Sequence, residues 1–169
     1  TELEFGFKLS GAEKTIQEKV QNKRVIHGLS GGVDSACLAV ILHRVCGPSA
    51  FSVFVNNGVL RKDEAEKVRA AFQNKINLGY VNASPLFLKR LKGRADPERK
   101  RKIIGHTFIQ IFEQEAKKFG AEFLAQGTLY PDVIESISAF GGPSVRIKTH
   151  HNVGGLPARL KLKLVEPFQ

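Results

Sequence analysis

Short apolar runs alternate along the chain with longer segments whose apolar residues recur at helical spacing. Buried strands are predicted at residues 25–29, 51–55, 78–81, 122–125 and 160–165. Because helical segments separate most of these runs, right-handed crossovers should join the strands into a parallel sheet. The pattern therefore predicts an α/β fold, with an open, mostly parallel five-stranded sheet and helices on both faces.

Turn and capping residues mark where the predicted helices begin and end. A short helix is expected at 12–20 with Ser10 as its N-cap, after a frayed lead-in at 1–10. The helix after the first strand ends at Gly47-Pro48, and the longest helix runs from Asp96-Pro97 to Gly120. Further helical segments are predicted at 61–73 and 85–91.

The expected organisation is one domain preceded by a short N-terminal element. Residues 1–23 form the lead-in and first helix, and residues 24–169 form the domain. Residues 137–157 contain six glycines and prolines and no periodicity. A loop this long inside a compact domain is typical of an active-site lid or of a disordered segment.

The first predicted strand leads into a glycine-rich turn and then a helix. The turn comprises Ser30, Gly31, Gly32, Val33, Asp34 and Ser35. This geometry directs backbone N–H groups at an anion, and serine hydroxyls add donors without bulk. Asp34 would repel a phosphate unless a divalent cation such as Mg²⁺ joined the two, so Asp34 is a candidate metal ligand. The alternative is an ordinary glycine-rich turn between a strand and a helix.

Composition narrows the setting of the protein. The net charge of +10 fits an anionic partner, namely a nucleotide, pyrophosphate or nucleic acid, and fits a merely soluble basic surface as well. The sequence has no apolar run that could span a membrane and no signal peptide. Cys37 and Cys46 lie on opposite sides of one predicted helix and cannot bridge, so a reducing, cytoplasmic location is expected. The chain has no Met, even at position 1, which suggests an excised fragment or missing Met positions.

A second acidic pair follows the fourth predicted strand. Asp132 and Glu135 are three residues apart and would share one face of a helical turn. Because ligands of an open parallel sheet sit beyond the carboxyl ends of its strands, these two side chains and Asp34 could hold Mg²⁺ over a triphosphate. Equally, Asp132 could be a helix N-cap and Glu135 a solvated side chain.

The chain resembles a known family in five blocks that occur in the family's order. Residues 30–35 resemble the pyrophosphate loop of the N-type ATP pyrophosphatases, which split ATP between its α and β phosphates. Residues 96–105, 126–136, 148–157 and 162–167 are similar to the ATP pyrophosphatase domain of GMP synthetases. The resemblance covers nearly everything from Val25 onward. It implies a Rossmann-like fold of the adenine nucleotide alpha hydrolase type.

The resemblance also implies an activity. Family members are ligases of purine biosynthesis that convert xanthosine 5'-monophosphate (XMP) to GMP, with ATP and Mg²⁺. The purine C2 oxygen attacks the α-phosphate of ATP, and ammonia then displaces AMP. Ammonia comes from a glutamine amidotransferase, and a C-terminal domain completes the XMP pocket and forms a homodimer. Neither module is recognised in this sequence, so the chain alone is predicted to bind ATP and yet fail to make GMP. No nucleic-acid or membrane partner is expected.

Roles for individual residues follow from the same resemblance. The loop residues hold pyrophosphate, and the implied catalytic set is Asp34, Asp132, Glu135, Lys148 and Lys163. Lys148, His150 and His151 match a lid over the adenylated intermediate. Lys163 matches a lysine near the α-phosphate, and Arg101 matches a position that contacts the XMP phosphate. The alternatives are a solvated strand lysine and a charged helix face.

Two further features concern the adenosine. Val55 and Gly127 are assigned to adenine from their places at strand ends. Where the family has Val-Asp-Asn-Gly, this chain has Asn56 in place of the aspartate. The lost negative charge is expected to weaken metal or ribose contacts.

The sequence leaves two rival functions open. One is another pyrophosphatase of the same fold, such as a tRNA thiolase or an NAD synthetase. A thiolase needs reactive cysteines, and none is placed for that role. The other is a catalytically incomplete, nucleotide-binding module.

Overall fold

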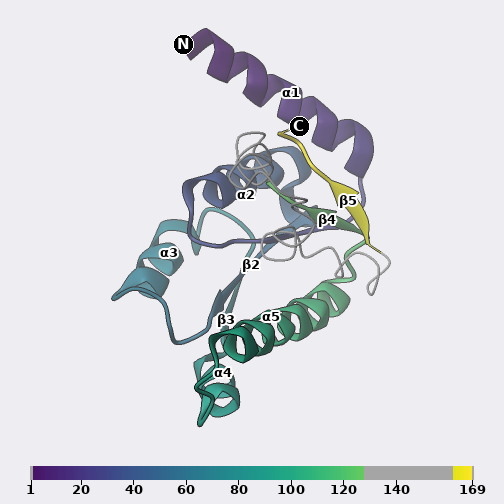
Figure 1. Ribbon diagram of the computed structural model, residues 1–169. Coiled ribbons are helices and arrows are strands. Elements are labelled where there is room, and N and C mark those ends of the chain that lie inside the picture. Colours follow the sequence, from purple (N-terminus) through teal and green to yellow (C-terminus); the bar gives the residue numbers. More distant parts are fainter. Residues whose placement is uncertain (1, 128–161, 169) are drawn as a thin grey trace, which may run out of the picture.

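The protein is built on a five-stranded parallel sheet. The computed structural model describes residues 2–127 and 162–168, with side chains from residue 11 onward. The strands are β1 Val25–Gly28, β2 Ala50–Asn56, β3 Leu78–Asn82, β4 Phe123–Ala125 and β5 Lys163–Val165. Their spatial order is β3-β2-β1-β4-β5, and every neighbouring pair is parallel (Figure 1). All five predicted strands are confirmed to within a few residues at their ends.

Helices cover both faces of this sheet, as predicted. They are α1 Glu2–Val20, α2 Val33–Cys46, α3 Glu64–Phe72, α4 Ser84–Leu91 and α5 Pro97–Phe119, with a 3-10 turn η1 at Gly47–Ser49. The first three helices lie on one face, and α4 and α5 lie on the other (Figure 1). This arrangement follows from the strand order. The right-handed crossovers through α2 and α3 lead from β1 to β2 and from β2 to β3, whereas the crossover through α4 and α5 leads in the opposite direction, from β3 to β4, and so places its helices on the other face.

Two apolar layers hold the helices to the sheet. Strand side chains point alternately to the two faces, so Val25 joins the cluster under α1 and α2 while Ile26 joins the cluster under α4 and α5. Phe54 of β2 faces α3, whereas its neighbours Val53 and Val55 face the α5 side. Burial on both faces explains why these strands are continuously apolar rather than alternating.

The N-terminal helix is longer than the sequence predicts. The expected lead-in at 1–10 is wrong for residues 2–10, because α1 begins at Glu2 and the predicted N-cap Ser10 lies inside it. Ile16 and Val20 are fully buried against α2 and the sheet. Once this packed turn has formed, each added residue costs little, and the helix extends over a segment that lacks an apolar period of its own.

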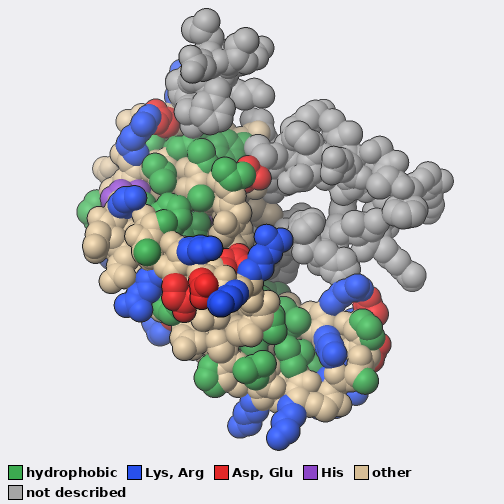
Figure 2. All heavy atoms as spheres, turned by 90° about the vertical axis from the view of Figure 1, so that its left-hand side faces the viewer, with side chains coloured by type: hydrophobic (Ala, Val, Ile, Leu, Met, Phe, Trp, Pro, Cys, Tyr) green, Lys and Arg blue, Asp and Glu red, His purple; other side chains and the backbone are tan. Residues whose placement is uncertain are grey.

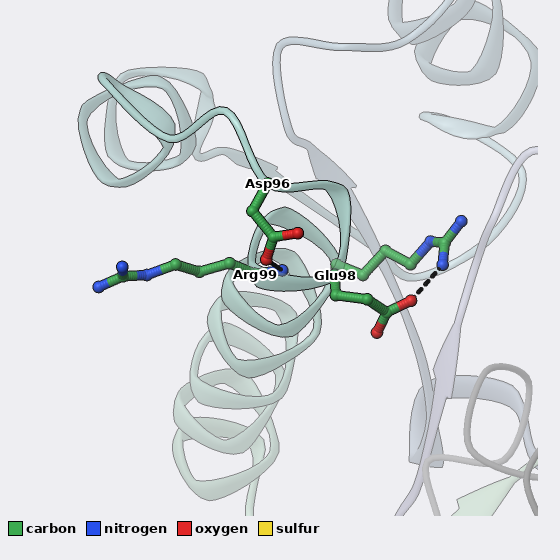
Figure 3. Close-up of polar contacts among 4 residues, drawn as sticks. Asp96, Glu98 and Arg99 are labelled. Carbon is green, nitrogen blue, oxygen red and sulfur yellow. Dashed lines mark hydrogen bonds and ion pairs between the residues drawn. The ribbon is translucent and has the colours of Figure 1, made fainter.

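Helix α5 begins and ends where the sequence predicts. The Asp96 carboxylate accepts a hydrogen bond from the Arg99 backbone N–H at 2.8 Å (Figure 3). Gly120 ends the helix in the left-handed conformation. At its C-terminus, the Arg24 guanidinium donates to the Phe119 carbonyl at 2.7 Å. Arg24 directly precedes β1, so α5 ends at the amino edge of the sheet. Its first turn therefore lies toward the carboxyl edge.

The described surface is mixed in charge. Figure 2 shows the side of the molecule that carries α2 and α3, where Lys and Arg side chains are spread around a small group of Asp and Glu side chains. No helix among the described residues is long and apolar enough to cross a membrane. Cys37 and Cys46 are both free thiols.

Candidate functional site

The glycine-rich turn leaves β1 at the point where the strand order reverses. On one side of β1 lies β2, reached through α2, and on the other lies β4, reached through α5. In an open parallel sheet, the crevice beyond the carboxyl ends of the strands at such a switch point is the usual place for a ligand. The turn predicted from the sequence therefore lies where the fold itself favours binding.

Gly31 gives the turn its shape. Its φ is +87°, a left-handed conformation that favours glycine, and a Cβ atom here would lie 3.2 Å from Glu64 Oε1 and 3.5 Å from Val68 Cγ2. The left-handed backbone conformation and the close approach of Glu64 thus both disfavour a side chain at this position. By contrast Gly32 has a φ of −75° and more space, so its conformation is open to other residues.

The two serines of the turn are bound to each other. The Ser30 and Ser35 hydroxyl oxygens lie 2.8 Å apart, and Ser35 Oγ also accepts the Ser30 N–H at 3.2 Å. Ser35 donates its hydroxyl hydrogen to the Gly32 carbonyl at 2.9 Å, so Ser30 is the donor between the two hydroxyls. Ser30 Oγ in turn accepts the Gly32 N–H at 3.3 Å. In this structure the hydroxyls therefore shape the turn, a role in addition to the predicted contact with pyrophosphate.

The first turn of α2 presents backbone donors. Gly32 is its N-cap and supplies no side-chain cap. Within the described residues, the N–H groups of Val33, Asp34 and Ser35 have no hydrogen-bond acceptor. Val33 is 80% exposed, so this end of the helix is open to solvent. Unpaired N–H groups and the positive end of the helix dipole suit an anion.

Asp34 stands in the same turn and is partly exposed. Its carboxylate has no hydrogen-bond or ion-pair partner in the described part of the chain. Within residues 2–127 and 162–168, no three His, Cys, Asp or Glu side chains gather as a metal site. A cation at Asp34 would therefore need oxygen ligands from a bound phosphate. This combination suits Mg²⁺, which is commonly held by one or two carboxylates together with phosphate oxygens.

Val55 and Gly127 both lie near the carboxyl edge. The Val55 side chain is buried in the cluster under α5, which leaves its backbone as the part available to adenine. Gly127 follows β4, and a Cβ atom there would lie 3.3 Å from Leu38 Cδ2 and 3.5 Å from Phe168 Cε2. The adenine assignments stay predictions that involve backbone rather than side chains.

Lys163 is not brought to the loop. It is the first residue of β5, in register with Phe123, whereas the loop follows the carboxyl end of β1. Its side chain is exposed, and its ammonium lies 5.8 Å from the centre of the Phe123 ring. This arrangement favours the alternative interpretation of a solvated strand lysine.

Arg101 lies in the second turn of α5, toward the carboxyl edge. Its guanidinium is exposed and pairs with the Glu98 carboxylate one turn earlier, at 2.5 Å (Figure 3). It is thus on the side of the sheet expected for a substrate, although the helix-face alternative accounts equally well for the ion pair.

Five other predicted site residues lie outside the described residues: Asp132, Glu135, Lys148, His150 and His151. The predicted lid at 137–157 lies outside them too.

The Asn56 side chain is engaged in hydrogen bonds within the protein, and the expected weakening of metal or ribose contacts stays a prediction. Its Oδ1 accepts the Gly58 N–H at 3.0 Å and the Ser84 hydroxyl at 3.2 Å, and its Nδ2 donates to Tyr80 Oη at 3.1 Å. The side chain is therefore engaged in joining the ends of β2, β3 and α4. An aspartate could accept from all three partners, so the family's aspartate and this asparagine can serve the same turn.

One residue of the site has no counterpart in the sequence-based prediction. His27 is the third residue of β1 and is buried beneath the loop. Its ring nitrogens contact the Ser35 carbonyl at 3.0 Å and the Ala125 carbonyl at 3.2 Å. The signal in the sequence is a single polar residue inside an otherwise apolar strand.

Together these features define a class of protein: an α/β protein with a glycine turn and an open helix N-terminus at the switch point of a parallel sheet. The family model described as NAD synthase matches residues 9–100, and the chain belongs to this family. The predicted fold class is thereby confirmed.

Similar curated proteins are named GMP synthase [glutamine-hydrolyzing]. The chain is 59% identical to the one from Zymomonas mobilis over 157 residues, which cover 91% of this chain and 30% of that protein. It is 59% identical to the one from Bradyrhizobium over 159 residues, covering 92% and 30%. The predicted resemblance to GMP synthetases is confirmed. The chain spans about 30% of the length of these relatives.

Two solved structures share the fold. An NH3-dependent NAD synthetase from Campylobacter jejuni, in complex with nitrate, aligns with a TM-score of 0.55 at 12% identity, over 76% of this chain and 56% of that one. A glutamine-dependent NAD+ synthetase from Acinetobacter baumannii, in complex with ADP, gives 0.56 at 16% identity, over 77% and 26%. At these identities the likeness concerns the fold alone.

Proposed function

We propose that this chain is the ATP pyrophosphatase part of a GMP synthase and that it activates XMP by adenylation. The observation that carries the proposal is the open turn at residues 30–35, in a chain 59% identical to GMP synthases over 91% of its length. The activity is ligase chemistry that forms a C–N bond in purine biosynthesis. ATP is consumed to AMP and pyrophosphate.

Adenylation answers the chemical difficulty of the amination. The purine C2 oxygen attacks the α-phosphorus of ATP and pyrophosphate leaves; ammonia then adds at C2 and AMP leaves with that oxygen. Without activation the leaving group would be hydroxide, whose conjugate acid has a pKa of about 15.7, whereas the second pKa of a phosphate is about 6. Roughly ten units of leaving-group basicity are removed.

The described residues would act on the pyrophosphate. The N–H groups of Val33, Asp34 and Ser35, at the positive end of α2, bind its oxygens where negative charge accumulates as the α–β bond breaks. The hydroxyls of Ser30 and Ser35 hold the turn in the conformation that presents these donors. Asp34 would hold Mg²⁺, which supplies charge neutralisation between carboxylate and phosphates when bound.

The rest of the site is proposed from the family resemblance. Asp132 and Glu135 would handle metal and ATP, and Lys148, His150 and His151 would belong to the lid. Arg101 would bind the XMP phosphate, and Val55 and Gly127 would contact adenine through their backbone. Lys163 is left out of this set because it lies away from the loop. A glutamine amidotransferase part supplies the ammonia, the complete enzyme is a homodimer, and its location is cytoplasmic.

The test separates binding from turnover. The chain alone should bind Mg-ATP and pyrophosphate in calorimetry but form no GMP from XMP, ATP and ammonium. A chimera is then made in which this chain replaces the matching 157-residue segment of the Zymomonas mobilis GMP synthase. This chimera should form GMP. AMP and pyrophosphate should appear with XMP and not with NAD precursors or tRNA. Release of AMP with another acceptor would favour a different enzyme of this fold.

A further inference from the structure

His27 links two elements that flank the proposed pyrophosphate site. It lies on the face of β1 that α2 covers and is 3% exposed. Nε2 lies 3.0 Å from the carbonyl oxygen of Ser35, in the first turn of α2. Nδ1 lies 3.2 Å from the carbonyl oxygen of Ala125, the last residue of β4 and the register partner of His27. One buried ring thus spans the switch point from helix to strand.

Both partners of the ring are hydrogen-bond acceptors. A neutral imidazole carries only one N–H, so it can donate to only one of the two carbonyls. Burial lowers the pKa of His27, against the two backbone hydrogen bonds, which raise it. The neutral ring is therefore favoured. We assign the N–H to Nε2, the ring nitrogen at the shorter distance, which then donates to the Ser35 carbonyl.

The Ser35 carbonyl belongs to the turn that presents the anion donors. A hydrogen bond to that carbonyl ties the first turn of α2 to β1, and the second ring nitrogen faces β4. The Ser35 side chain closes the glycine turn through Ser30 and Gly32. His27 therefore contacts the backbone of Ser35, the same residue whose side chain shapes the loop.

We propose that His27 is a positioning residue, which holds the N-terminal turn of α2 in the orientation that binds pyrophosphate by donating a hydrogen bond to the Ser35 carbonyl. This inference rests on the proposed function of the loop. His27 itself is not proposed to touch a substrate. An apolar side chain of similar size would fill the same space without orienting the turn.

Three substitutions separate the two contacts. In His27→Gln the amide nitrogen stands close to the place of Nε2 and keeps a donor for Ser35. In His27→Asn the amide nitrogen stands near Nδ1 and faces Ala125 instead. His27→Leu retains volume and removes both donors. Each variant is compared with the unmodified chain in thermal unfolding and in calorimetric titration with pyrophosphate and with Mg-ATP.

The expected result is a split between stability and binding. His27→Gln should bind pyrophosphate within about threefold of the unmodified chain, whereas His27→Asn and His27→Leu should bind about tenfold more weakly, as the loss of one hydrogen bond predicts. His27→Leu removes a buried polar side chain but leaves the Ser35 and Ala125 carbonyls without the ring, so its unfolding temperature should stay close to the original. The imidazole ¹⁵N shifts should report the Nε2–H tautomer.

Several results would overturn the proposal. Equal pyrophosphate affinity in all four proteins would leave the proposed function intact and remove the role of His27. Binding losses that follow the unfolding temperature would mean a structural role only, and an Nδ1–H tautomer would contradict the assigned contact. If the unmodified chain bound neither pyrophosphate nor Mg-ATP, the proposed function itself would fail, and this inference with it.

Discussion

The Ser35 hydroxyl lies 2.8 Å from the Ser30 hydroxyl and donates to the Gly32 carbonyl at 2.9 Å. One side chain from the helix thus closes the turn that precedes it. Ser35 Oγ also accepts the Ser30 N–H. Ser35 therefore has more contacts within the loop than Ser30, and the two serines should differ in their sensitivity to substitution.

Ser35→Ala should weaken Mg-ATP binding about tenfold to hundredfold. The substitution removes three hydrogen bonds of the turn. In these exposed surroundings each bond contributes at most about 1 kcal/mol to the stability of the turn. Ser30→Ala should have a smaller effect, because the Ser35 contact to Gly32 remains. Calorimetry measures both affinities, and Ser49→Ala, in η1 away from the loop, serves as the control. Equal affinities for Ser30→Ala and Ser35→Ala would contradict this ranking.

Gly31→Ala should destabilise the protein, and Gly32→Ala should not. At Gly31 the φ of +87° costs an L-residue about 1–2 kcal/mol, and the new Cβ presses on Glu64. At Gly32 the φ is −75°, and the nearest atom, Ser30 Oγ, would lie 3.5 Å from the Cβ. Urea denaturation should show a lower free energy of unfolding for Gly31→Ala and a change within about 0.5 kcal/mol for Gly32→Ala. A similar loss in both variants would contradict the assignment of the cost to the left-handed conformation and close contact at Gly31.

His27 should make stability depend on pH below about 6.5. Burial lowers its pKa from the ordinary value of 6.5, so the unfolded chain binds a proton more readily than the folded one. The stability from the neutral ring is complete above 6.5 and is lost as the pH falls toward the lowered pKa. The free energy of unfolding of the original chain minus that of His27→Gln, measured from pH 8 to 5, should decrease as the pH falls. A constant difference would mean that His27 does not titrate differently on folding.

The strands and the glycine-rich turn were predictable because their signals are local. Apolar runs buried on both faces give β1 and β2, and Asp96 and Gly120 mark α5 through capping chemistry that acts within one turn. The order of the strands then places the turn at the switch point without further information.

Other features depend on contacts between distant segments. Helix α1 extends to Glu2 because its C-terminal half packs on α2, which the local pattern does not show. Gly31 is confined by Glu64 of α3, and His27 is bound to Ala125, 98 residues away. Asn56 meets Tyr80 from the next strand. Such contacts are set by packing and register, so a reading of spacing alone assigns these residues to a ligand or overlooks them.

Helix α5 carries two ion pairs of the same spacing at its opposite ends, and these allow a controlled test of the XMP assignment. Arg101 pairs with Glu98 toward the carboxyl edge of the sheet, and Lys118 pairs with Glu115 at 2.6 Å toward the amino edge. Both cations are exposed, so each pair contributes at most about 0.5 kcal/mol. In the chimeric GMP synthase, Arg101→Ala should raise the KM for XMP about tenfold or more and leave the KM for ATP unchanged. As the control, Lys118→Ala should leave both KM values unchanged and should unfold at the same temperature as Arg101→Ala. An unaltered KM for XMP in Arg101→Ala would instead mean that Arg101 is an ordinary residue of a charged helix face.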